Sequence, residues 1–145
     1  WDNYMPEILK ILNEIKDQDI LENYIRIGIR YNSEYPEIDI RTSTKFNFTF
    51  GLPEIISNKF SFSSEFIHNE HRVILQLLNK NNTSDPNNIK ATSVIDIDII
   101  KENLNINKND FEKLIPIITK AHDLEKEIFF KLLQPDFFNS LNPTY

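Results

Sequence analysis

Two aspartates, Asp96 and Asp98, stand one residue apart in the apolar stretch SVIDIDII at residues 93–100. On a β-strand, alternate residues point to one face and lie about 7 Å apart. Two carboxylates at this spacing can hold a divalent cation that clamps phosphate oxygens, as in nucleotidyl-transfer enzymes. Such enzymes also need a phosphate-binding loop, but the two glycines, Gly28 and Gly51, stand far apart. The pair is therefore a candidate metal site that rests on a two-residue motif alone.

A structural role for the same aspartates is the interpretation that we favour. Arg26 and Arg30 occupy the polar face of a predicted strand at residues 23–31. If that strand lies beside residues 93–100, we expect Arg26, Arg30, Asp96 and Asp98 to form a polar network of cross-strand ion pairs. Exposed pairs of this kind contribute only about 0–1 kcal/mol each. The residues that alternate with the aspartates are expected to face the core: Ile95, Ile97 and Ile99.

The three histidines offer no recognisable catalytic set. His68 and His71 flank a predicted turn and could meet a metal or a phosphate, but their spacing matches no known ligand pattern, so solvated turn residues are the preferred interpretation. His122 and Asp123 are adjacent on a predicted helix and do not face each other. We expect His122 to border the core and to hydrogen-bond to a strand. No nucleophile elbow, P-loop or dinucleotide fingerprint occurs, so we predict no catalytic residue and no cofactor.

A stripe of phenylalanines is the one candidate for a ligand cavity. Its members alternate along two predicted strands: Phe46, Phe48, Phe50, Phe60 and Phe62. Side chains at this spacing share one sheet face and usually form ordinary core, but they can also line a pocket between a sheet and a helix. Core is the preferred interpretation, and the pocket is the alternative.

Hydrophobic periodicity sets the order of the elements that position these residues. A period near 3.6 predicts helices at residues 4–18 and 108–134, and alternation predicts strands at residues 23–31, 44–50, 58–67, 71–80 and 90–100. Residues 32–43 are predicted to be a loop with a short extended piece at Ile38–Ile40. Pro116 must either begin the main part of the last helix or kink it. The predicted class is α+β, with an antiparallel sheet of about five strands and both helices packed on one face, an arrangement similar to the helix-grip fold.

Length and composition limit the function. The 145 residues are expected to form a single domain, 1–145, within a longer chain, because the sequence begins with Trp1 rather than Met. The chain has no cysteine, which excludes disulfides, a cysteine-ligated zinc and a thiol nucleophile. The formal net charge of −6 disfavours nucleic acid and anionic membranes as partners. No stretch has the length of a membrane span, and a cytoplasmic location is expected.

One stretch resembles a family signature. YIRIGIRY, with Arg26, Gly28, Arg30 and Tyr31, resembles the arginine–apolar–glycine–apolar–arginine–tyrosine motif of a sporadically distributed family of uncharacterised prokaryotic proteins. In that family the motif follows a helix and precedes a DID-like strand and a helix with AH and IFF segments, which match Val94–Ile99 and Ala121–Leu133. Here RYNSEYP replaces the apolar residue and asparagine that often continue the motif, and Pro116 is a second departure. The resemblance implies the α+β layout, a prokaryotic source and an additional N-terminal portion. It does not supply catalytic residues, cofactors or a substrate.

Two functional hypotheses follow. The favoured one is a non-catalytic binding or interaction domain, which uses either a cleft between sheet and helix or the polar sheet face, with a protein partner or a second copy of the chain as candidate partners. The alternative is a metal-dependent nucleotide- or phosphate-processing enzyme centred on Asp96 and Asp98.

Overall fold

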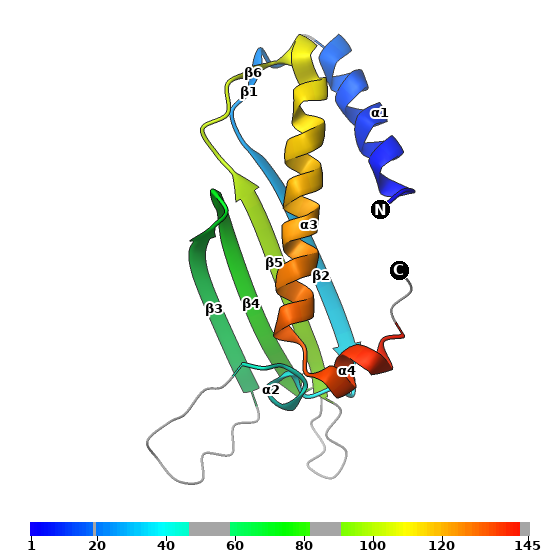
Figure 1. The fold of residues 1–145 in the computed structure, drawn as a ribbon, viewed down its shortest axis with the longest axis vertical. Helices are drawn as coiled ribbons and strands as arrows, with labels where there is room; N and C mark the ends of the chain where they lie inside the picture. Colours follow the sequence, from blue (N-terminus) through cyan, green and yellow to red (C-terminus); the bar gives the residue numbers. More distant parts are fainter. Residues whose placement is uncertain (19, 47–58, 82–90, 143–145) are drawn as a thin grey trace.

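A computed structural model describes residues 1–18, 20–46, 59–81 and 91–142 of the chain (Figure 1). The elements are α1 (Tyr4–Asp17), β1 (Asn23–Tyr24), β2 (Ile27–Pro36), α2 (Ile40–Ser43), β3 (Lys59–His68), β4 (His71–Asn81), β5 (Ala91–Lys101), β6 (Ile106–Asn107), the 3₁₀ helix η1 (Lys108–Leu114), α3 (Ile115–Leu132) and α4 (Pro135–Ser140). No helix in the described ranges is long and apolar enough to cross a membrane.

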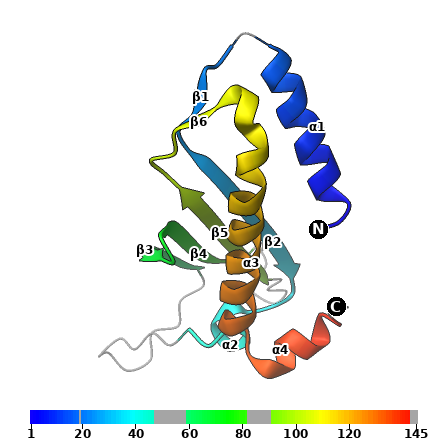
Figure 2. The ribbon, with the colours of Figure 1, turned by 45° about the horizontal axis from the view of Figure 1, so that its top comes forward.

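The predicted α+β class is confirmed. Four strands form an antiparallel sheet in the order β2-β5-β4-β3, and β1 pairs with β6 in a separate two-stranded ribbon. The long helix α3 packs on one face of the larger sheet, over β5 and β2 (Figures 1 and 2). The sequence predicted one sheet of about five strands, whereas the described residues form a sheet of four and a ribbon of two.

Strand β5 lies inside the sheet and supplies the centre of the core. Its three alternating isoleucines face α3 and are at most 1% exposed: Ile95, Ile97 and Ile99. The neighbouring β3–β4 hairpin turns at Asn69 and Glu70, whose φ angles of 47° and 63° are both left-handed. A two-residue turn of this kind matches the right-handed twist of the strands that it joins. The predicted hairpin and the predicted inward face of β5 are therefore both confirmed.

The region after the arginine motif differs from its prediction. The predicted strand at residues 23–31 is divided into β1 and β2, and β2 continues to Pro36 through part of the predicted loop. The half-buried side chains of Tyr31, Ser33 and Tyr35 keep the alternation, and every residue of β2 has a partner on β5. Proline is tolerated where this edge strand ends. Polar composition at residues 32–36 therefore misled the loop prediction.

The residues that follow β2 also differ from their predictions. Of the predicted extended piece at Ile38–Ile40, Asp39 has extended backbone angles, whereas Ile40 begins the short helix α2. The side chain of Asp39 caps this helix by accepting a hydrogen bond from the Arg41 amide. Of the predicted strand at residues 44–50, the described part makes one isolated bridge, between Thr44 and Leu133. Residues 47–50 lie outside the described residues.

The long helix α3 begins one residue before its proline. Pro116 lies in the first turn of α3, and the preceding residues form η1 instead of an additional α-helical segment. A proline in the first turn has no intrahelical hydrogen bond to lose. Of the two alternatives left open by the sequence, Pro116 therefore opens the main helix and does not kink it.

Helix α1 runs beside α3 and packs against η1 (Figure 2). None of its residues is buried, although Ile8, Leu12 and Ile15 are half-buried on its apolar side. The chain before this helix contacts α3 through Trp1, whose ring stacks on His122 at a centroid distance of 3.9 Å.

Candidate functional site

The structure brings Asp96 and Arg30 together on the face of the sheet that α3 leaves uncovered. Arg30 Nε and Nη2 donate to the two carboxylate oxygens of Asp96 at 2.9 and 2.6 Å, and the Asn32 amide adds a contact of 3.3 Å. The Arg30 guanidinium holds the pKa of Asp96 below its usual value. Both carboxylate oxygens of Asp96 accept hydrogen bonds, and the residue is only 4% exposed, so the structure favours a structural role for Asp96.

Asp98 lies on β5 and Arg26 directly precedes β2, and both side chains are near Gly28. A Cβ added to Gly28 would lie 3.5 Å from Asp98 Oδ1 and 3.9 Å from Arg26 Nη2. Within the described ranges neither Asp98 nor Arg26 forms an ion pair, so the Arg30–Asp96 pair is the member of the predicted network that forms there. No group of three His, Asp or Glu side chains in the described part of the chain is placed to hold a metal ion.

The histidines occupy three different environments. His71 is buried and its Nδ1 lies 2.7 Å from the backbone oxygen of Asn69, while His68 is exposed. His122 borders the core, and its Nδ1 lies 2.6 Å from the hydroxyl of Tyr31 on β2, the hydrogen bond to a strand that the sequence predicted. Burial, followed by the charge of Lys126, lowers the pKa of His122.

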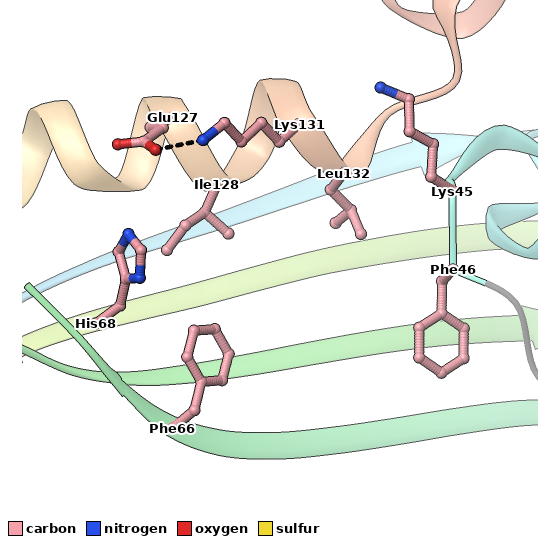
Figure 3. Close-up of a pocket in the computed structure, with 8 residues that line it drawn as sticks. All are labelled: Lys45, Phe46, Phe66, His68, Glu127, Ile128, Lys131 and Leu132. Atoms are coloured by element: carbon pink, nitrogen blue, oxygen red, sulfur yellow. Dashed lines mark hydrogen bonds and ion pairs between the residues drawn. The ribbon is translucent and has the colours of Figure 1, made fainter.

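An apolar cleft opens beside α3, on the side of strand β3 (Figure 3). Its volume is about 390 Å³. It exists because α3 covers β5 and β2, whereas the inward face of β3, at the far edge of the sheet, has less of the helix above it. Four apolar side chains line the cleft: Phe46, Phe66, Ile128 and Leu132. Phe66 is 38% exposed, which is unusual for an aromatic residue on the inward face of a strand.

The rim of the cleft is mainly basic. Lys45, His68 and Lys131 lie around the apolar floor, and Glu127 is the acidic residue among the lining side chains. Glu127 is already engaged, because Lys131 Nζ donates to it at 2.5 Å and holds its pKa below the usual value (Figure 3). Within the described ranges the ammonium of Lys45 has no ion-pair partner. The cleft therefore has a basic rim in a chain whose net charge is −6.

The predicted phenylalanine stripe contributes partly to this cleft and partly to the core. Phe46 lines the cleft and also packs against Phe60 and Phe62, at centroid distances of 5.9 and 4.3 Å, so these two rings join the core. Phe48 and Phe50 lie outside the described residues. Phe66 was missed, although it continues the alternation of Phe60 and Phe62 along β3.

The other cleft residues carry no comparable sequence signal. Lys45 follows α2 and reaches the cleft because its backbone amide donates to the carbonyl of Leu132, at the end of α3. This contact joins segments that are far apart in the sequence, and periodicity does not report it.

Comparison of the chain with protein-family models, with curated proteins and with solved structures finds no match. The fold and the cleft define an α+β domain with an open apolar pocket between a long helix and an edge strand.

Proposed function

We propose that this protein is a non-catalytic binding domain whose cleft between α3 and β3 binds an organic acid with an apolar body. The observation that carries the proposal is the open apolar pocket with a basic rim. Phe46, Phe66, Ile128 and Leu132 would contact the apolar body, and Lys45 would pair with the acid group. Burial of apolar surface contributes about 25 cal/mol per Å², so a short alkyl chain supplies the affinity and the lysine supplies the selectivity.

Calorimetric titration with octanoate tests the proposal, and 1-octanol serves as the uncharged comparison. We expect saturable binding of octanoate and weaker binding of octanol. Lys45→Met should weaken octanoate binding by about fivefold, the equivalent of about 1 kcal/mol, and leave octanol binding unchanged. Phe66→Ser should weaken the binding of both ligands, because it removes an exposed part of the apolar floor.

The matched control is Lys113→Met, which removes an exposed lysine from η1, outside the cleft, where its partner is Asp110. The control variant should bind octanoate like the parent protein. Absence of saturable octanoate binding, or equal effects of the Lys45 and Lys113 substitutions, would contradict the proposal.

The metal-dependent enzyme centred on Asp96 and Asp98 is the alternative hypothesis. The engagement of Asp96 by Arg30 and Asn32 favours the binding domain over it. Calorimetry with Mg²⁺ and Mn²⁺, with and without nucleotides, tests the alternative directly, and heat that is lost in Asp98→Asn would support it. A cytoplasmic location, a protein partner or second copy, and membership of the prokaryotic family also stay predictions.

A further inference from the structure

A second cavity lies on the opposite flank of α3, towards strand β2. Its volume is about 330 Å³, which is within the range of small-molecule sites. Side chains from three parts of the chain line it: Trp1, then Ser33 of β2, then His122, Glu125 and Phe129 of α3. The cleft of the proposed function uses Glu127, Ile128, Lys131 and Leu132 of the same helix, so the two cavities have no lining residue in common.

Glu125 is the unusual group in this second cavity. It is only 7% exposed, and within the described ranges it forms no hydrogen bond or ion pair. Burial raises the pKa of its carboxyl to about 7, and the nearby charge of Lys126 opposes that rise. Buried carboxylates are normally paired, because taking an unpaired charge out of water is costly. Glu125 therefore presents to the cavity a carboxyl that has no partner among the described residues.

Aromatic rings line the same cavity as this carboxyl. Trp1 stacks on His122 with an interplanar angle of 7°, and the hydroxyl of Tyr31 holds His122 at Nδ1. Burial and Lys126 lower the pKa of His122, so the ring is predominantly neutral at neutral pH and does not compensate the acid. The faces of aromatic rings attract cations, and a carboxylate beside them adds a counter-ion. Lys126 is the basic side chain that lines the cavity.

We propose that the cavity between α3 and β2 binds a small organic ammonium ion, with the Glu125 carboxylate as its counter-ion and the Trp1 and Phe129 rings as its walls. This site would supply Glu125 with the partner that the described residues do not. It is independent of the cleft on the β3 side and takes a ligand of the opposite charge. Neither site is a condition for the other.

The fluorescence of Trp1 reports on this site, because it is the one tryptophan of the chain and it lines the cavity. We expect benzylamine to change the fluorescence saturably and benzyl alcohol, its uncharged counterpart, to bind at least about tenfold more weakly. Glu125→Gln keeps the shape of the side chain and removes its charge, and it should weaken benzylamine binding by about tenfold or more. Lys126→Met should strengthen the binding, because it removes a like charge.

The control is Glu127→Gln, which changes an acid on the same helix that does not line this cavity. It should bind benzylamine like the parent protein, and far-ultraviolet circular dichroism confirms that each variant is folded. Equal binding of benzylamine by Glu125→Gln and the parent, equal binding of benzyl alcohol and benzylamine, or no saturable change would each overturn the proposal. Octanoate binding should be unaffected by Glu125→Gln. The experiments therefore test the octanoate cleft and the ammonium site independently of each other.

Discussion

The buried carboxyl of Glu125 makes the stability of this fold depend on pH in an unusual direction. Burial raises its pKa from 4.5 to about 7. Since each pH unit between these values corresponds to about 1.4 kcal/mol, ionisation of Glu125 costs the folded state at most about 3.5 kcal/mol. A raised carboxyl pKa means that the folded state binds the proton more tightly than the unfolded state. The free energy of unfolding should therefore fall as pH rises from 4.5 to about 7 and should not fall further above that range.

Glu125→Gln isolates this effect, because glutamine has the shape of the protonated acid and no charge. Urea denaturation of the parent and the variant between pH 4.5 and pH 8 gives the difference in unfolding free energy at each pH. The two proteins should be similarly stable at the acid end, and the variant should become more stable by up to about 3.5 kcal/mol at pH 8. Glu127→Gln is the control and should lack this trend, since Lys131 lowers the pKa of Glu127. A pH-independent difference for Glu125→Gln would refute the reasoning.

Three further substitutions test the scaffold. Ile97→Ala, at a fully buried position of β5, should lower the free energy of unfolding by about 2–5 kcal/mol in urea denaturation. Arg30→Met should raise the pKa of Asp96, and nuclear magnetic resonance titration measures this change. In the parent protein, the stabilisation from the Arg30–Asp96 pair is present above pH 3.8. It is lost as pH falls through the lowered pKa of Asp96. An unchanged Asp96 pKa would show that the pair does not form. Gly28→Ala should change the unfolding free energy by no more than about 0.5 kcal/mol, because the added Cβ meets only ordinary contacts; a larger loss of stability would contradict this.

The sequence predicts the centre of this fold well. Strand β5 alternates isoleucine and aspartate, and one face of an antiparallel sheet must bury the apolar set, so the inward direction of Ile95 and Ile97 follows from period alone. The same reasoning places Arg30 and Asp96 on the opposite face once β2 pairs with β5. The tight β3–β4 turn is equally predictable from the short polar segment between two apolar runs.

The edges of the fold are harder to predict. Strand β2 continues through polar residues as far as Pro36 because β5 supplies hydrogen-bonding partners along its whole length, and a local pattern does not report that pairing. The ribbon of β1 and β6 has two residues per strand, which is too short to give a periodic signal. Tertiary contacts therefore determine how far β2 extends and where β1 and β6 form.

The residues of the two cavities also divide into those that the sequence pattern indicates and those that tertiary contacts bring into place. Phe66 could have been found from the alternation of β3, and Glu125 could have been found as an acid within the apolar stripe of α3, next to Leu124 and three residues before Ile128. Their partners come from distant segments: Lys45 is brought to the cleft by Leu132, and Trp1 is brought to the second cavity by its stacking on His122. The sequence identifies candidate side chains, but the packing of α3 on the sheet determines which of them share a cavity.

The most direct test of the proposed binding function is a titration of isotope-labelled protein with octanoate, followed by nuclear magnetic resonance of the backbone amides. A ligand in the cleft should shift the signals of Phe66 and His68 on β3 and of Ile128 and Leu132 on α3, with saturation at the affinity found by calorimetry. Shifts that are confined to the Arg30–Asp96 face of the sheet, or no saturable shifts, would contradict the account.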